Sequence, residues 1–467
     1  MTRQPENTSK AGKHRAVKKI LDQNACDFSA SGNEHIDGLV QERLHTMGPT
    51  SVLFYRKPLE FTHGDGAWLF DGDGNRFLDV YNNVAVLGHA HPAVQLAVSE
   101  QLKKLNTHSR YLNKASHDYA QQLLSTVPDT RSDYLNDPRL LMTCTGSEAN
   151  DVALRLAFLA SGAQGVIVSE AAYHGNTYLV NQVSPSSCKK VPDWVATFSL
   201  DALQQEDLTP EQAQAAITLE INRAINTLSN HGYGVAALLV DSIFSSDGVY
   251  SHPPGFLTTA VDIVREAGGL FIADEVQPGF ARTGEQFWGY LRHSTEQQPL
   301  VPDIITFGKP MGNGYPVAGL ITGNALLQTF ADEEGYFNTF AGTHAAIAAA
   351  QAVLSAIQTE HLQDNARETG ALFKRELNAL MAEFTCIKAV RGAGLFIGVD
   401  LVNAAGNADA QLTSQVINAM RDLGILIGAA GKSGSTLKIR PPLCFSAENV
   451  ALFISRLRAV LTSLNND

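Results

Sequence analysis

The sequence predicts an α/β protein with a large domain around a mostly parallel central sheet and a smaller α+β domain built from both chain ends. Three observations lead to this fold class. Short apolar runs alternate with helical patterns from about residue 82 to 345, which is typical of βαβ units. A hairpin pattern precedes this region, and a compact mixture of helices and strands follows it. A chain of 467 residues, 44% of them hydrophobic, is long enough for both domains.

The individual elements follow in chain order. Two partly apolar runs around a polar, glycine-rich turn at 67–80 predict a hairpin. Pro92 is placed to open a helix, a second helix is expected near 116–125, and a capping-box pattern at 209–212 opens a third. The predicted strands of the central sheet are 140–144, 166–168, 235–241, 270–274 and 304–307.

The region after residue 345 begins with an alanine-rich helix to about residue 357. A helix at 372–381, a strand at 395–401 and a helix at 416–423 are expected beyond it. The chain is therefore divided into a polar, flexible tail at 1–30, an N-terminal part of the small domain at 31–81, the large domain at 82–345 and a C-terminal part of the small domain at 346–467.

Composition and charge exclude several classes of partner. The 35 basic and 47 acidic residues give a net charge of −12, and no basic face suited to nucleic acid or an anionic membrane stands out. No apolar run reaches the length of a membrane span. The first residues lack the apolar core of a secretory signal, and a solvated tail explains them better than a transit peptide. We expect a cytoplasmic protein whose scattered cysteines are reduced thiols: Cys26, Cys144, Cys188, Cys386 and Cys444.

Polar residues that follow predicted strands are the candidates for a binding site, because ligands of parallel sheets gather at the strands' carboxyl ends. Lys309 lies in a glycine-rich stretch after one strand, where a lysine could form an imine, and Asp274 ends another strand. Residues 145–147 (Thr-Gly-Ser) join a strand to a helix and could bind phosphate. Tyr173 follows a further strand and could stack on a planar ligand.

Each of these residues also has an ordinary structural explanation. Lys309 could be a surface lysine, and Asp274 could be a helix cap or half of a salt bridge. Thr145 or Ser147 could simply cap a helix, and Tyr173 could be half-buried packing. Taken together, however, a phosphate seat, a stacking ring, an acid and an imine-forming lysine describe a site for pyridoxal 5′-phosphate.

Several longer motifs make the chain recognisable. It resembles the class III aminotransferases of the fold type I pyridoxal-phosphate enzymes, from about residue 48 to the C-terminus. The matching segments are 88–92 (GHAHP), 145–150 (TGSEAN), 172–177 (AYHGNT), 271–280 (FIADEVQPGF) and 307–310 (FGKP). The resemblance implies a fold type I architecture and a homodimer, or a dimer of dimers, with active sites at the subunit interface.

The resemblance also implies a role for each matching residue. Lys309 would carry the cofactor as a Schiff base and move the substrate proton, and Asp274 would pair with the pyridinium nitrogen. Thr339 would reach the phosphate of the partner subunit's site. The remaining cofactor contacts would come from Gly146 and Ser147 at the phosphate, Tyr173 and Val276 on the ring faces, and Gln277 at the ring hydroxyl. His89 and His91 lack the acidic or thiol companions of a metal site, so no metal is expected.

The substrate-binding segment departs from the family pattern. Many members carry an arginine for the substrate carboxylate three residues before a Pro-Pro pair, and this chain has Lys438 there, with Arg440 directly before the prolines. Lysine is a point charge, whereas arginine offers a planar fork suited to carboxylate. Both residues are candidate substrate contacts. Two other departures are Asp241, where a glutamate is common, and Gly-Thr-His at 342–344 in place of Gly-Asn-Pro.

Two activities are compatible with these residues. The resemblance favours a ping-pong aminotransferase that moves an amino group from an amino acid or ω-amine to a 2-oxo acid such as pyruvate or glyoxylate. The alternative is a phospho-lyase that eliminates phosphate from an amino-alcohol phosphate such as phosphoethanolamine. The subgroup similar to this chain contains both activities. A cofactor-free scaffold is a third hypothesis, which the presence of Lys309 and Asp274 disfavours.

Overall fold

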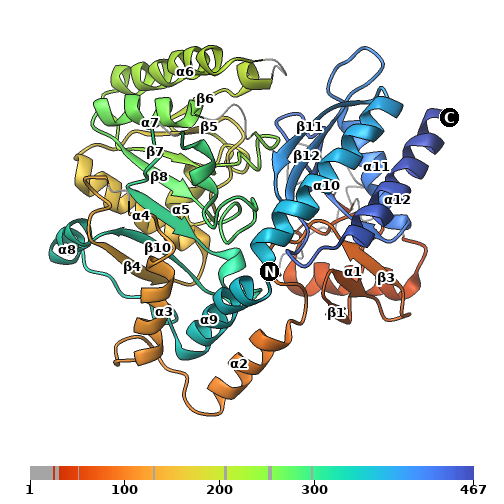
Figure 1. Cartoon of the computed structure of the whole chain (residues 1–467), viewed down its shortest axis with the longest axis horizontal. Helices are drawn as coiled ribbons and strands as arrows, with labels where there is room; N and C mark the ends of the chain where they lie inside the picture. Colours follow the sequence, from red (N-terminus) through yellow and green to blue (C-terminus); the bar gives the residue numbers. More distant parts are fainter. Residues whose placement is uncertain are drawn as a thin grey trace, which may run out of the picture.

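The structure is a computed structural model that describes residues 25–26, 31–50, 52–129, 132–204, 208–250, 255–295 and 298–466. A large α/β unit and a smaller unit with two four-stranded sheets lie side by side (Figure 1). The predicted tail, residues 1–30, falls outside the described residues except at 25–26. The predicted boundaries at 81/82 and 345/346 stay a prediction.

The large sheet has seven strands, and β10 (Ala318–Gly323) is antiparallel to both of its neighbours. The other neighbouring pairs are parallel. This confirms the predicted fold class, a mostly parallel central sheet beside a smaller α+β domain. The strand order is β4 (Pro138–Thr143), β10, β9 (Ile304–Phe307), β8 (Leu270–Asp274), β7 (Ala237–Val240), β5 (Val166–Ser169) and β6 (Val195–Phe198).

Alternate side chains of the large sheet enter two different cores, because successive side chains of a strand point to opposite faces. On β8, Phe271 and Ala273 join one core, and Leu270 and Ile272 join the other. Helices α6 (Pro210–Asn230) and α7 (Phe256–Glu266) cover the first face; α4 (Gly146–Ser161), α5 (Tyr178–Gln182) and α8 (Asn324–Glu333) cover the second. The sheet is therefore buried on both faces.

Helix starts follow the expected signals. Pro92 is the first residue of α2 (Pro92–Leu102), and Thr209 and Gln212 form a complete capping box at α6. Helix α2 packs against α9 (His344–Thr359), and α3 (Lys114–Leu124) also contacts α9. Short 3₁₀ turns are η2 (Asp201–Gln204), η3 (Gly289–His293) and η4 (Lys309–Gly312). No helix in the described ranges is both long and apolar enough to cross a bilayer.

The smaller unit is assembled from both chain ends, which Figure 1 shows as red and blue segments lying together. The first sheet has the order β1 (His63–Asp65), β2 (Trp68–Phe70), β3 (Arg76–Asp79) and β13 (Ile425–Leu426), and β2–β3 is the predicted hairpin. The second has the order β11 (Ile387–Ala393), β12 (Phe396–Leu401), β15 (Thr436–Ile439) and β14 (Gly428–Ala430). The helices are α1 (Glu34–Met47), α10 (Leu362–Glu383), α11 (Ala410–Asp422) and α12 (Ala447–Asn466).

Candidate active site

A cavity of about 270 Å³ lies at the carboxyl ends of the parallel strands, where the sequence analysis expected a site. Residues that follow β4, β5, β7, β8 and β9 line it together. Seven of the predicted site residues are among them: Gly146, Ser147, Tyr173, Asp274, Val276, Gln277 and Lys309. The strand topology therefore brings most of the predicted site into one place.

One end of the cavity is the N-terminus of α4. Thr145 caps the helix by accepting a hydrogen bond from Glu148 N, and Glu148 Oε2 accepts from Thr145 N, which completes a capping box. The amides of Gly146 and Ser147 occupy the first helical turn, where backbone N–H groups have no intrahelical acceptor. These amides and the Ser147 hydroxyl form a seat suited to a phosphate group.

Two glycines allow the backbone to close around this seat. A Cβ atom on Gly146 would lie 2.7 Å from Val276 Cγ2. A Cβ atom on Gly175, which has a φ of +147°, would lie 2.4 Å from Ser147 Oγ. Any larger side chain at either position would therefore displace residues that line the cavity.

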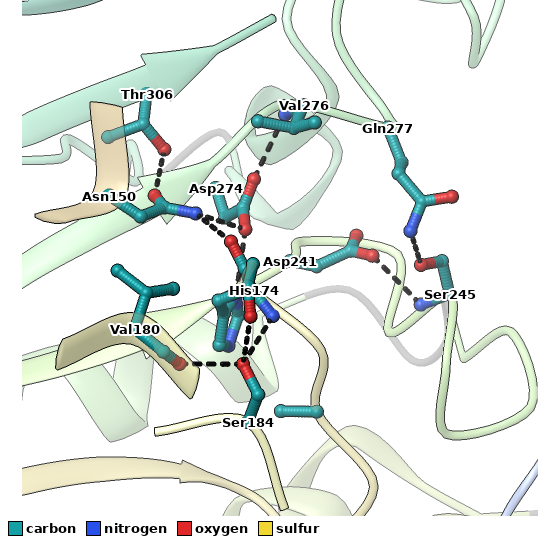
Figure 2. A network of polar contacts seen from close by, with 12 residues as sticks. Asn150, His174, Val180, Ser184, Asp241, Ser245, Asp274, Val276, Gln277 and Thr306 are labelled. Atoms are coloured by element: carbon teal, nitrogen blue, oxygen red, sulfur yellow. Dashed lines mark hydrogen bonds and ion pairs between the residues drawn. The ribbon is translucent and has the colours of Figure 1, made fainter. Parts of the chain in front are cut away.

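Asp274 is the centre of a buried polar network (Figure 2). Its Oδ2 accepts hydrogen bonds from His174 Nδ1 at 2.7 Å and Asn150 Nδ2 at 2.9 Å, and its Oδ1 accepts from Val276 N at 3.0 Å. Asn150 is fixed in turn, because its Oδ1 accepts from Thr306 Oγ1 at 2.6 Å. Three donors therefore hold this carboxylate in one orientation.

The sequence analysis gave no role to Asn150, His174 or Thr306. Asn150 lies in the matching segment 145–150, and His174 lies in the segment 172–177 next to Tyr173. Their position in these segments is the only sequence feature that could have pointed to a role in the site. Thr306 lies on β9 directly across from Asp274 in the parallel register, so only the strand pairing reveals it. His174 Nε2 is buried and has no hydrogen-bond partner among the described residues.

Lys309 is the first residue of η4, immediately after β9 and Gly308. Burial lowers the pKa of its amino group, and the nearby Arg440 lowers it further, whereas Asp274 and Asp241 act in the opposite direction. No acceptor among the described residues lies within hydrogen-bonding distance of its Nζ. The amine is therefore kept less basic than an ordinary lysine and is available inside the cavity.

Asp241 and Gln277 also line the cavity. Burial raises the pKa of Asp241, and Asp274 adds to this, while amides of Ile243 and Ser245 stabilise its charged form. Gln277 Nε2 donates to Ser245 Oγ. The loop after β7 is thereby attached to the loop after β8.

The two candidate substrate residues lie beside the cavity, and neither belongs to its lining. Arg440 donates to Gln277 Oε1 and places its guanidinium carbon 4.4 Å from the centre of the Tyr81 ring. Lys438, on β15, is 6% exposed, and its Nζ lies 5.7 Å from the centre of the Phe396 ring. Burial and Arg440 hold the pKa of Lys438 well below its usual range.

Thr339, which is predicted to serve another subunit, lies in the segment between α8 and α9. It is exposed and does not line the cavity of its own chain. Its neighbours Phe337 and Phe340 are 50% and 73% exposed. Exposed aromatic side chains at this density are typical of a contact surface.

Comparison with known proteins agrees with this geometry. The model of the family described as aminotransferase class-III matches residues 55–461. The chain belongs to the class III aminotransferase family. This membership confirms the predicted enzyme class and its pyridoxal 5′-phosphate cofactor.

Relatives of this class III chain carry two kinds of name. It is 36% identical over 440 residues to the Drosophila melanogaster protein "Alanine--glyoxylate aminotransferase 2-like", covering 91% of this chain and 87% of that protein. It is 34% identical over 447 residues to the Caenorhabditis elegans "Ethanolamine-phosphate phospho-lyase homolog 1", covering 91% and 94%. A solved phospholyase from Arthrobacter in complex with phosphoethanolamine matches with a TM-score of 0.84 and 38% identity, over 91% of this chain and 99% of that one.

The residues of this class III chain fit the cofactor. Lys309 offers a half-buried amine that lines the cavity, and the α4 N-terminus offers amides and a hydroxyl for a phosphate group. Asp274 offers a fixed carboxylate for a protonated ring nitrogen. Tyr173 and Val276 line the same cavity and supply apolar contact area for a ring.

The two histidines considered as metal ligands in this class III chain contact different carboxylates. His89 Nε2 is 2.7 Å from Asp79 Oδ2, and His91 Nε2 is 3.1 Å from Glu360 Oε1. The described residues contain no group of three or more His, Cys, Asp or Glu side chains that could hold a metal ion. Their contacts explain both histidines as structural residues.

Proposed function

We propose that this class III enzyme is a phospho-lyase that converts an amino-alcohol phosphate and water into an aldehyde, ammonia and inorganic phosphate. The sequence analysis placed transamination first and this reaction second. We reverse the order because of one observation: Lys438 and Arg440 form a pair of cationic groups beside the cavity, and Lys438 is buried without an acidic partner in hydrogen-bonding contact among the described residues.

The free-energy cost of burying Lys438 next to Arg440 supports a phosphorylated substrate. Burying an ammonium group is unfavourable, and burial together with Arg440 lowers the pKa of Lys438, whereas Asp241 and Asp247 act in the opposite direction. A dianionic phosphate placed between Lys438 and Arg440 would offset this cost. A single carboxylate can be bound by one arginine guanidinium. This chain has a lysine instead of that arginine at position 438.

Each group then has a chemical task. Bound pyridoxal 5′-phosphate supplies an electron sink for the charge left when a carbon–hydrogen bond breaks. Lys309 takes the proton from the carbon that carries the substrate nitrogen, and its lowered pKa favours the neutral amine that a base requires. Lys438 and Arg440 stabilise the negative charge on the departing phosphate. Asp274 keeps the cofactor's ring nitrogen protonated.

Transamination is the second candidate. Arg440 presents a planar guanidinium held against Tyr81 and Gln277, and such a fork suits a substrate carboxylate. The aminotransferase-like name of the Drosophila relative agrees with it. In that case Lys309 would again hold and move the substrate proton, and the amino group would pass from the donor to a 2-oxo acid in the second half of a ping-pong reaction.

A half-reaction separates the two activities. The holoenzyme is mixed, without any oxo acid, with phosphoethanolamine, alanine or an ω-amino acid, while free phosphate and the cofactor spectrum are recorded. We expect many phosphate molecules per active site from phosphoethanolamine, with the original spectrum retained. Stoichiometric loss of the original spectrum, with an oxo product and no phosphate, would make the enzyme an aminotransferase.

Substituting Lys438 with methionine should selectively impair the phosphorylated substrate. Loss of one charge-assisted hydrogen bond costs about 1.5–3 kcal/mol, or roughly 10- to 150-fold in kcat/KM. Lys432→Met is the matched control, because Lys432 lies on the β14–β15 connection, just before the strand that carries Lys438, but is exposed and paired with Glu170. Equal kcat/KM for phosphoethanolamine in Lys438→Met and wild type would remove Lys438 from the substrate site.

We further propose a homodimer, possessing two shared active sites, as the working form. Exposed apolar side chains of α2 and of the segment after it support this: Leu96, Leu102, Leu105, Tyr111 and Leu112. They are joined to the exposed 337–340 segment through Arg110, whose guanidinium carbon lies 4.0 Å from the centre of the Phe337 ring. Assembly beyond the dimer and a cytoplasmic location stay predictions.

Thr339→Ala tests the shared site. If Thr339 donates to the phosphate in the other subunit, its loss should raise the dissociation constant of the cofactor about 10- to 100-fold without dissociating the dimer. Equilibrium dialysis and gel filtration measure the two quantities. Thr329→Ala is a suitable control, because Thr329 is exposed on α8 and donates only to Ala325 O. Unchanged cofactor affinity in Thr339→Ala would contradict a shared site.

A further inference from the structure

The segment between α8 and α9 is attached to the helix that holds the phosphate seat of its own chain. At its start, Arg155 of α4 pairs with Glu334, with 2.5 Å between Nη2 and Oε2. Tyr336 Oη then donates to Met142 O on β4 at 3.0 Å. These contacts fix the segment from its first residues.

Asn338 makes the contact nearest to the seat. Its Nδ2 donates to Glu148 Oε2 at 3.4 Å, and its Oδ1 lies 3.5 Å from the Cys144 thiol, which donates to it. The same Glu148 oxygen accepts from the amides of Cys144 and Thr145 at 2.7 and 3.1 Å. Asn338 therefore touches the capping box of α4, and Cys144 and Thr145 also line the cavity.

Thr339, the next residue, is exposed on the surface of the chain. Asn338 is half-buried, whereas Thr339 and the flanking Phe337 and Phe340 are exposed. Asn338 Oδ1 also accepts hydrogen bonds from the amides of Phe340 and Ala341, at 3.2 and 3.3 Å, and so fixes the backbone on the far side of Thr339. One asparagine thus links the phosphate seat of its own chain to an outward-facing threonine.

We propose that Asn338 is a positioning residue that couples the two active sites of the dimer. The inference rests on the proposed shared site, in which Thr339 contacts the phosphate in the partner's cavity. Ordering the α4 N-terminus around a phosphate in one subunit fixes Glu148, Glu148 fixes Asn338, and Asn338 sets Thr339 for the other subunit. Coupling of this kind is reciprocal, so each site favours occupation of the other.

The wild-type apoenzyme should consequently bind the cofactor with positive cooperativity. Couplings between sites are commonly about 5- to 150-fold in affinity, and we expect the second site to bind at least about fivefold more tightly than the first. A titration of the dimeric apoenzyme, followed by absorbance and equilibrium dialysis, measures the two constants. Asn338→Ala should weaken the second binding step to the level of the first.

Two further variants test whether Asn338 acts through its contact with Glu148 or only stabilises the local turn. Asn338→Asp keeps the oxygen that accepts from Phe340 N and Ala341 N but loses the donor to Glu148, so it should behave like Asn338→Ala. Gln328→Ala is the control, because this exposed amide of α8 contacts only Asp332 and should keep wild-type cooperativity. Cooperative binding by Asn338→Asp would reduce Asn338 to a local turn residue and overturn the inference.

Mixed dimers locate the effect. Two differently tagged chains are co-expressed, and one of them carries Lys309→Ala. The other chain keeps Lys309 and is called the reporting chain. Borohydride reduction attaches the cofactor covalently only to the reporting chain. Asn338→Ala is then added to either chain. We expect at least about fivefold weaker occupation of the reporting site when Asn338→Ala is on the opposite chain, and a smaller effect when it is on the reporting chain.

The outcomes distinguish this inference from the proposed function. A larger effect when the substitution is on the reporting chain itself would overturn the coupling and leave the shared site intact. The same holds if Thr339→Ala weakens cofactor binding while Asn338→Ala does not. A monomeric wild-type enzyme would overturn the coupling and the proposed dimer together, while phosphate release in the half-reaction would still stand.

Discussion

Replacing Lys309 with alanine is expected to lower kcat/KM about 10⁴-fold and to remove covalent retention of the cofactor. The amine lines the cavity directly after β9, where desolvation and Arg440 lower its pKa. A positioned acid–base group contributes about 10²–10⁴-fold, and the loss of the covalent attachment falls on the same residue. Steady-state kinetics and dialysis followed by absorbance measure both effects.

The control for this variant is Lys432→Ala, an exposed lysine whose ion pair with Glu170 lies outside the cavity. It should keep wild-type kinetics and retain the cofactor. Circular dichroism of both variants checks that the fold is unchanged. Substantial turnover by Lys309→Ala, above about a tenth of the wild-type rate, would exclude Lys309 as the proton-transfer residue.

Asp274→Asn is expected to lower kcat/KM about 10³-fold, comparable to the loss of a preorganised electrostatic contact. The two carboxylate oxygens accept from Val276 N, Asn150 Nδ2 and His174 Nδ1. An asparagine has only one acceptor oxygen, so its amide group would face a donor. The mismatch should also reduce the free energy of unfolding by about 1–3 kcal/mol, which thermal or urea unfolding measures.

Asp303→Asn separates these two effects. Asp303 is a buried carboxylate that accepts from Phe271 N at 2.8 Å and from Arg265 Nη2 at 3.0 Å, and it does not line the cavity. This control should lose a similar amount of stability and keep its kcat/KM. If both variants lost activity equally, the defect would come from destabilisation, and Asp274 would have no specific role in the chemistry.

The positions of Lys309, Asp274 and the 145–147 turn could be predicted from the sequence, because all of them follow apolar runs. Parallel strands bring such positions to one edge, whatever the order of the strands. The cavity lining agrees with this expectation. The turn at 145–147 also carried its own local signal, since Thr145 and Glu148 have the spacing of a capping box.

Other parts of the site depend on contacts between distant segments. Nothing in the local sequence near Lys438 indicates that β15 lies between β12 and β14, which is what buries this lysine. The contacts of Asn150 and His174 with Asp274 join residues that are 124 and 100 positions apart. The placement of β10 between β4 and β9 likewise follows from long-range pairing alone.

The parallel pair β3–β13 has a consequence for how the protein folds. It joins Leu78 to Ile425 and Asp79 to Leu426, about 350 residues apart in the chain. During synthesis, the edge of β3 that pairs with β13 stays unpaired until nearly the whole chain has been made. Such long-range pairing is slow to form. The smaller unit is therefore expected to complete last, and refolding intermediates should show a formed seven-stranded sheet before β3 gains protection from hydrogen exchange.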